Sequence, residues 1–212
     1  RAFIADNHHP SLFNFAVKTM ENYVGIYHYQ QIMTPIIEPV ELFQRSLGLE
    51  TDVVSKEMFI VTSSSGMGDE SICLRPEMTA STVRAFVEAG IQITPWKVYS
   101  YGPMFRYERP QKGRYRQFHQ FGIEVFGLPG PDIDAEILTM TARLWKRLNL
   151  EKLLILKINS LVSLETRAKY RTHLIDYFSK YRDLLDNESK MRLETNPLRI
   201  LDSKNEALKT VI

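Results

Sequence analysis

The chain has 212 residues, of which 44% are hydrophobic and 25% are charged, as is typical of a soluble globular protein with one domain and part of a second. The net charge of +2 is too small for the bulk field to attract nucleic acid, so any such binding must come from local patches. The single cysteine excludes an intrachain disulfide framework, and no apolar stretch is as long as a membrane span. Since a signal-peptide pattern is also missing, we expect a cytoplasmic protein with no membrane partner.

The first quarter of the chain predicts a helix, a strand and a second helix. Apolar residues recur at helical spacing over residues 10–24, after the adjacent histidines His8 and His9. These two histidines lack a third ligand, so we assign no metal site. Residues 31–38 then predict a strand, and residues 40–47 predict a helix that ends at the following glycine.

Two further β-favouring runs predict a hairpin. Residues 58–62 and 71–75 flank a segment of small residues and glycines at 63–69, which is the composition of a turn. The segment lacks the Gly-Lys-Ser/Thr ending of a phosphate loop. We expect Cys73, in the second run, to be a small buried hydrophobic residue.

The segment Leu-Arg-Pro-Glu-Met-Thr at 74–79 opens a predicted helix that extends to about Glu88 and is closed by Gly90. Glu77 and Thr79 lie at its first turn, where acids and hydroxyls commonly cap a helix. Capping would by itself account for both residues.

Residues 98–126 predict a strand, a long basic loop and a second strand. The loop and its edges carry five cations against one carboxylate, Glu108; the cations are Arg106, Arg109, Lys112, Arg114 and Arg116. Such an excess of positive charge indicates a site for a polyanion.

The second of these strands has two different faces, because side chains alternate along a strand. The more apolar face, which suits packing under a helix, has His119, Phe121, Ile123 and Val125; the other has Phe118, Gln120, Gly122 and Glu124. Gln120 and Glu124 are separated by roughly 13 Å in an extended strand. They could therefore hold the two ends of a small polar ligand, with Gly122 leaving room for it. An ordinary solvated sheet face is the alternative.

The remainder of the chain is predicted to be mostly helical. Residues 128–134 predict a turn that caps a helix over 135–148, and residues 153–158 predict another strand. A long amphipathic helix starts at Ser163, and a polar connection covers residues 186–197.

The run Phe-Arg-Tyr-Glu-Arg-Pro-Gln-Lys-Gly-Arg-Tyr-Arg-Gln-Phe-His-Gln-Phe-Gly-Ile-Glu at 105–124 resembles motif 2 of class II aminoacyl-tRNA synthetases, in the version found in histidyl-tRNA synthetases. The resemblance extends from about Phe13 to the end of the chain. Residues 34–39 resemble motif 1, with Pro35 at the place of its characteristic proline. This resemblance implies a homodimer interface at Pro35, whereas the residues alone are equally consistent with a proline on an edge strand.

The resemblance implies a histidine site and an ATP site. In the histidine site, Glu77, Thr79 and Gln120 would receive the α-ammonium, and Glu124 would face the imidazole. Arg106 would be the catalytic residue, bridging the histidine carboxylate and the α-phosphate of ATP. Phe118 would stack on adenine, and the further ATP contacts would be Glu108 and Arg114. Mg²⁺ is expected to accompany ATP, and other parts of the loop would approach the tRNA acceptor end.

The implied fold is α+β, with a class II synthetase-like antiparallel sheet flanked by helices and followed by the start of a helical insertion domain. We place the catalytic core at residues 1–162 and the beginning of the insertion domain at 163–212. The implied reaction is activation of histidine with ATP to histidyl-adenylate, followed by transfer to tRNA(His). Motif 3 and an anticodon-binding domain do not occur in this sequence, so we expect residues 1–212 alone to be weakly active or inactive.

Two other hypotheses remain open. A histidine-sensing regulatory paralogue of a histidine-biosynthetic ATP phosphoribosyltransferase would share the fold without charging tRNA, although the intact basic loop and the Arg-Pro-Glu-x-Thr segment favour the synthetase. A basic nucleic-acid-binding module would suit the loop but would leave Gln120 and Glu124 unexplained.

Overall fold

The computed structural model describes residues 9–48, 51, 53–62, 71–159, 162–203 and 205–212. The chain divides into two compact units, Arg1–Ile155 (unit 1) and Leu156–Ile212 (unit 2). The division therefore precedes the boundary expected between residues 162 and 163. None of the helices in these ranges is both long and apolar enough to cross a membrane.

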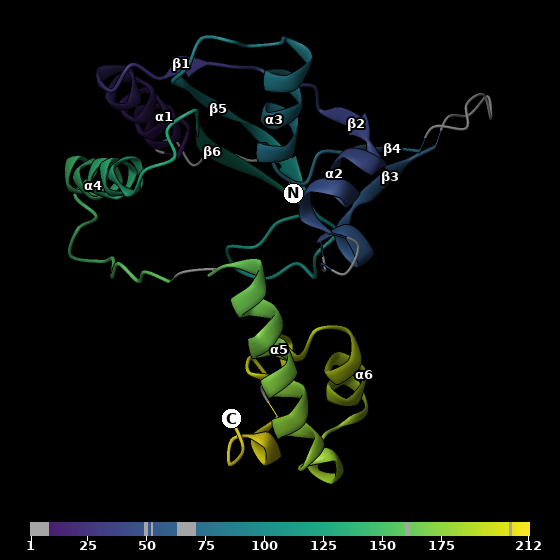
Figure 1. Ribbon diagram of the computed structural model, residues 1–212. Helices are drawn as coiled ribbons and strands as arrows, with labels where there is room; N and C mark the ends of the chain where they lie inside the picture. The colour runs from purple at the N-terminus through teal and green to yellow at the C-terminus, as the bar shows by residue number, and fades with distance from the viewer. Residues whose placement is uncertain (1–8, 49–50, 52, 63–70, 160–161, 204) are drawn as a thin grey trace. The chain divides into compact units, whose positions relative to one another are not determined.

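A sheet of three strands forms the centre of unit 1 (Figure 1). Strands β5 (Trp96–Phe105) and β6 (Gln117–Phe126) pair antiparallel over their whole length, and the short β1 (Gln30–Gln31) runs parallel to β5. The strand, loop and strand predicted from the sequence are thus confirmed. Because β6 pairs without a bulge, its alternate side chains keep to opposite faces, as predicted.

Helices α1 (His9–Ile26) and α4 (Pro131–Arg147) cover one face of this sheet (Figure 1). Their buried residues form one apolar cluster with the adjacent sheet residues; the cluster includes Tyr23, Val24, Tyr29, Met140, Leu144, Tyr99, Phe121, Ile123 and Val125. The apolar side of β6 therefore packs under helices, as predicted. Helix α4 begins at Pro131 and not at residue 135, because proline suits the first helical position and Asp132 and Asp134 favour the first turn.

Helix α3 (Thr79–Glu88) lies over the opposite face of the sheet (Figure 1). Phe86 of α3 stacks on Phe126 of β6, with ring centroids 4.6 Å apart. The helix has the predicted extent, and Gly90 follows it with a φ of 57°, a conformation that glycine adopts at little cost.

A second, antiparallel sheet in unit 1 has the order β2 (Ile37–Pro39), β4 (Ile72–Leu74) and β3 (Phe59–Val61). Helix α2 (Val40–Leu47) ends before Gly48, as predicted, and packs against this sheet and α3 through Phe43. Cys73 is fully buried, as expected, and burial raises the pKa of its thiol to about 11. The pairing of β3 with β4 confirms two arms of a hairpin, whereas the predicted connection at 63–69 lies outside the described residues.

The strand predicted over residues 31–38 is interrupted. Its ends form β1 and β2 in different sheets, and residues 32–36 belong to neither. Pro35 has no N–H to donate to a sheet, and the carbonyls of Thr34 and Pro35 accept hydrogen bonds from the buried side chain of Arg75. The Arg75 guanidinium thus binds carbonyl groups of Thr34 and Pro35 that a partner strand would otherwise bind.

The prediction of a strand over residues 153–158 is wrong, because this segment is irregular and its apolar side chains are exposed. Ile155, for example, is 86% exposed. The segment pairs with no strand among the described residues, and an apolar run needs a partner to become a strand.

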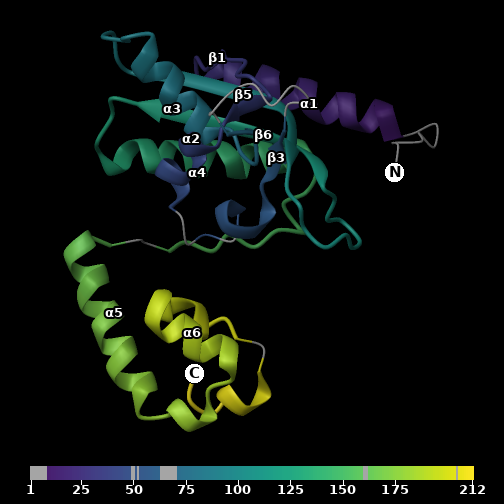
Figure 2. The ribbon, with the colours of Figure 1, turned by 90° about the vertical axis from the view of Figure 1, so that its right-hand side faces the viewer.

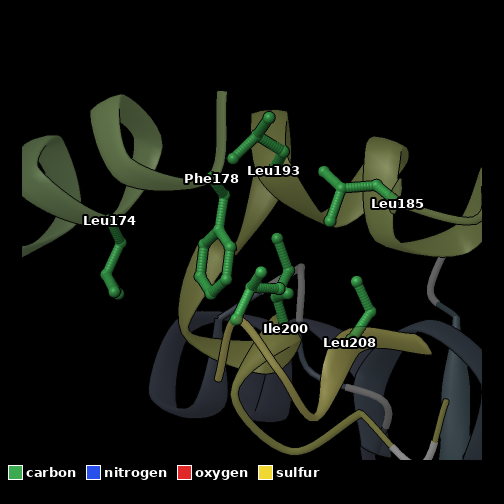
Figure 3. Packing of buried hydrophobic residues seen from close by; sticks show 7 residues of the cluster. Leu174, Phe178, Leu185, Leu193, Ile200 and Leu208 are labelled. Atoms are coloured by element: carbon green, nitrogen blue, oxygen red, sulfur yellow. The ribbon is translucent and has the colours of Figure 1, made fainter. Parts of the chain in front are cut away.

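Unit 2 is a small helical body with its own core (Figures 2 and 3). Helix α5 (Leu164–Ser179) begins at its N-cap Ser163, as predicted. The region predicted as a polar connection instead contains α6 (Asn187–Thr195), because Asp186 accepts from the backbone N–H of Ser189 at 2.7 Å and caps it. The core of unit 2 has Leu174, Phe178, Leu185, Leu193, Ile200, Leu208 and Val211.

Candidate active site

The face of sheet β1-β5-β6 that points toward α3 has the side chains predicted for the site. Phe118, Gln120, Gly122 and Glu124 of β6 lie opposite Met104, Gly102, Ser100 and Val98 of β5, respectively. A Cβ added at Gly122 would meet only Ser100 Oγ, at an ordinary contact distance of 3.8 Å. The strand therefore has room for a Cβ between Gln120 and Glu124, and occupation of this position by a ligand stays a prediction.

Helix α3 joins this face through a hydrogen bond between Thr79 and Glu124. Thr79 Oγ1 donates to Glu124 Oε1 at 2.6 Å. Burial raises the pKa of the Glu124 carboxyl, and the negative charge of Glu77 raises it further, whereas the Thr79 bond opposes the shift. Glu124 is thus partly desolvated and interacts with a second carboxylate, which favours a ligand with positive or N–H donor groups.

Glu77 caps helix α3, as the sequence allowed. Its Oε2 accepts from the backbone N–H of Thr79 at 2.5 Å, and its Oε1 accepts from that of Ala80 at 2.9 Å. Glu77 is buried, so the carboxylate is fixed at the start of the helix. Each oxygen still has a lone pair that can accept from a ligand.

The side chain of Gln120 contains a hydrogen-bond acceptor that has no donor partner among the described residues. Its side-chain oxygen Oε1 is buried and accepts no hydrogen bond from any residue that the structure describes. A buried polar atom without a partner is unfavourable, typically by about 1–3 kcal/mol. A ligand donor bound on this face would remove that cost.

Arg106 directly follows β5 and is held by two contacts. Its Nε donates to the carbonyl oxygen of Pro76 at 3.0 Å, and its guanidinium carbon lies 5.2 Å from the centroid of the Phe118 ring. Among the described residues, nothing accepts from its two terminal nitrogens, which are therefore available to an anion. A planar guanidinium fixed in this way suits bidentate binding of a carboxylate or phosphate.

The basic loop brings Glu108 and Arg114 together as an ion pair of 2.8 Å. Arg114 is largely exposed, and such pairs contribute little to stability, so a phosphate could replace the carboxylate at small cost. Arg116 lies 3.9 Å above the ring of Tyr107, whose backbone N–H donates to Glu57. Tyr107 thus fixes the loop, a role that the sequence pattern did not indicate.

The dimer interface at Pro35 stays a prediction, and no metal site is predicted from the sequence. Pro35 lies in the segment between β1 and β2 and is exposed. No cluster of three or more metal-ligating side chains occurs within the described ranges.

Sequence inspection missed Arg75, a buried arginine whose side chain bonds Thr34, Pro35 and Pro103. The clue in the sequence was a single arginine in an otherwise apolar β-favouring run. That position is inside the fold, where a charge requires acceptors.

Residues 59–209 match the profile of the tRNA synthetase class II core domain (G, H, P, S and T). The chain is 54% identical over 194 residues to a histidine–tRNA ligase of Neisseria meningitidis serogroup C and 53% identical over 194 residues to that of Neisseria gonorrhoeae. These alignments cover 91% of this chain but 44% of each relative, so the chain spans less than half the length of these curated relatives.

Solved structures share the fold of this chain. The crystal structure of apo histidyl-tRNA synthetase from S. aureus matches with a TM-score of 0.70 and 32% identity, covering 100% of this chain and 50% of that one. A protein from Bacillus halodurans described as an ATP phosphoribosyltransferase regulatory subunit/histidyl-tRNA synthetase shares the fold, with a TM-score of 0.60 and 17% identity over 100% of this chain and 57% of that one. With its profile match over more than half of its length, the chain belongs to the family of the tRNA synthetase class II core domain (G, H, P, S and T).

Proposed function

We propose that the protein containing this chain is a histidine–tRNA ligase. In the first step, a carboxylate oxygen of histidine attacks the α-phosphorus of ATP, and pyrophosphate leaves to give histidyl-adenylate. In the second step, a terminal ribose hydroxyl of tRNA(His) attacks the acyl carbon, and AMP leaves.

The unpartnered oxygen of Gln120 is the observation that best supports histidine as the ligand. It lies on the same face as Glu124, with the space above Gly122 between them. An α-ammonium at Gln120, Glu77 and Thr79 and an imidazole N–H at Glu124 would supply donors to acceptors on this face. The identity to relatives named histidine–tRNA ligase supports the same ligand.

Catalysis is expected to depend on positioning and charge neutralisation, not on a covalent nucleophile. The terminal nitrogens of Arg106 would bind the histidine carboxylate and the α-phosphate, holding the reacting atoms together. Phe118, beneath the Arg106 guanidinium, would stack on adenine, and Glu108 and Arg114 would contact ATP. The triphosphate would supply most oxygen ligands of the accompanying Mg²⁺, which needs no all-protein cage.

The proposal extends to two macromolecular partners. The exposed cations of the basic loop, such as Arg109 and Lys112, suit the tRNA acceptor end. A second copy of the protein would pack at the segment containing Pro35, which resembles motif 1; a complete gene product that sediments as a monomer would contradict this. A ligase for tRNA implies a cytoplasmic location.

The decisive experiment is ATP–pyrophosphate exchange by the complete gene product. We expect exchange that requires histidine and is not supported by other amino acids. A regulatory paralogue would bind histidine without exchange, and a nucleic-acid-binding module would do neither. Histidine binding without exchange would therefore overturn the ligase assignment.

Replacing Gly122 by valine tests the ligand space directly. Valine is compatible with a strand, and an added Cβ meets no described atom closer than 3.8 Å, so we expect the variant to fold. Its side chain would occupy the space between Gln120 and Glu124, weakening histidine binding about 10- to 100-fold, as overpacking by 1–3 kcal/mol would. Calorimetric titration with histidine measures the loss, and Gly122→Ala should show a smaller one. Unchanged affinity in a folded Gly122→Val protein would show that histidine binds elsewhere.

A further inference from the structure

Arg75 is a buried cation that has no role in the reaction proposed above. Only 5% of the residue is exposed. Burial lowers the pKa of its guanidinium, and the negative charge of Glu38 acts in the opposite direction. An arginine nonetheless remains charged in proteins, so its burial must be compensated by many hydrogen bonds.

Those bonds join two segments that are distant in sequence. Arg75 Nη1 donates to the carbonyl oxygens of Thr34, at 2.7 Å, and Pro35, at 3.4 Å, while Nε donates to that of Pro103 at 3.0 Å. The backbone of Arg75 repeats this bridge: its N–H donates to Ile36 and its carbonyl accepts from Phe105, at 2.9 and 3.0 Å. Arg75 thereby fixes the end of β5.

Gly102 of β5 provides the space for this guanidinium. A Cβ at position 102 would lie 2.6 Å from Arg75 Nη2, closer than real Cβ atoms approach another heavy atom. Glycine therefore permits the arginine to lie against the strand. The contrast with Gly122, whose Cβ would meet nothing closer than 3.8 Å, shows that the two glycines serve different purposes on one face.

The contacts of Arg75 converge on Arg106. Phe105, which immediately precedes Arg106, donates its N–H to the carbonyl of Arg75. Pro76, which immediately follows Arg75, accepts from Arg106 Nε at 3.0 Å. The backbone of the neighbouring Phe105 and the side chain of Arg106 are thus held by the main chain of Arg75 and Pro76.

We propose that Arg75 is a positioning residue that sets the location of the Arg106 guanidinium during amino-acid activation. The inference rests on the proposed ligase function and adds a residue to it. Arg75 touches no substrate in this scheme. The proposed role concerns the location of Arg106, whereas Gln120 and Glu124, on β6, make no hydrogen bond with the side chain of Arg75 in the described part of the chain.

Arg75→Lys in the complete gene product tests this role. Lysine keeps the charge but cannot reach Thr34, Pro35 and Pro103 with one planar fork. We expect the kcat of histidine-dependent ATP–pyrophosphate exchange to fall about 100-fold, because a displacement of about 1 Å can cause such a loss. This kcat is expressed per active site, and the active sites are counted from the single-turnover burst of adenylate formation. The KM for histidine should rise much less than kcat falls, because the proposed contacts at Gln120 and Glu124 also hold histidine. Lys97→Met, which removes a cation from the other face of β5, is the matched control and should retain its kcat.

Gly102→Ala is the second variant, because it keeps Arg75 but displaces Nη2, and it decides the question if Arg75→Lys does not fold. Gly102 pairs with Gln120, so the histidine affinity of this variant is measured separately by titration. A loss of kcat that is clearly larger than the loss of histidine affinity supports the proposal. Folded variants that exchange with the wild-type kcat per active site would overturn the positioning role alone. A histidine KM that rises as much as kcat falls would overturn it too. Failure of the wild-type protein to exchange would instead overturn the ligase function.

Discussion

Replacing Arg106 by lysine is expected to lower the kcat of histidine-dependent ATP–pyrophosphate exchange about 100- to 1,000-fold, equivalent to about 2.7–4 kcal/mol of transition-state stabilisation. Lysine retains one positive charge but loses the fork that could bind a carboxylate and a phosphate together. It also loses the Nε bond to Pro76 and the planar contact with Phe118, which fix the side chain before substrate arrives.

The measurement is steady-state exchange with the complete gene product, with histidine binding measured separately. Arg143→Lys is a suitable control, because Arg143 is an exposed arginine of α4, the helix that covers the opposite face of the sheet. We expect the control to exchange at the wild-type rate. An Arg106→Lys protein with normal kcat would remove this residue from the chemistry.

Replacing Glu124 by glutamine is expected to weaken histidine binding about 10- to 100-fold, in line with the 1.5–3 kcal/mol of a hydrogen bond to a charged group. The carboxylate accepts from Thr79 and lies on the same sheet face as Gly122, where an imidazole N–H would complete its hydrogen bonding. Glutamine preserves the size of the side chain but lacks the charge. Titration with histidine measures the effect, and normal affinity would exclude Glu124 from the site.

The same substitution should make the folded protein more stable at neutral pH. Because burial and the charge of Glu77 raise the pKa of Glu124 in the folded state, the folded protein binds this proton more tightly than the unfolded chain. The free energy of unfolding therefore falls as pH rises through the interval between the ordinary pKa and the raised one. Removing the ionisable group removes this loss.

Thermal unfolding at two pH values tests that sign. Glu124→Gln should raise the Tm relative to wild type at pH 7 and have little effect near pH 4, where the wild-type carboxyl group is largely protonated. Glu136→Gln, in which the altered carboxylate pairs with Lys97 on the other face, should lack this gain. A Tm for Glu124→Gln below wild type at pH 7 would mean that Glu124 contributes more to the fold than to the ligand site.

The strand that carries Gln120 and Glu124 was predictable because a single rule, alternation along β6, decided which residues share a face. Helix α3 was predictable for a similar reason, since its apolar spacing and its closing Gly90 are local signals. The roles of Glu77, Thr79, Arg106 and Phe118 in ligand binding came from the resemblance, and they remain predictions that the variants described above address.

Sequence inspection failed where distant residues decide the structure. Residues 32–36 leave the predicted strand because Arg75 takes two of their carbonyls. Residues 153–158 have the composition of a strand but find no partner among the described residues. Helix α6 was missed because its few apolar residues give little periodicity, although Asp186 is a recognisable N-cap.

The double role of the Glu77 carboxylate affects how mutations near it can be interpreted. Its oxygens already hold the first turn of α3, so a variant such as Glu77→Gln would change the free energy of the helix start together with that of any bound ammonium. The buried oxygen of Gln120 has no such structural duty among the described residues. Substitution of Gln120 would therefore report the ligand contact with less confounding, and a double-mutant cycle between the two positions would separate scaffold from recognition.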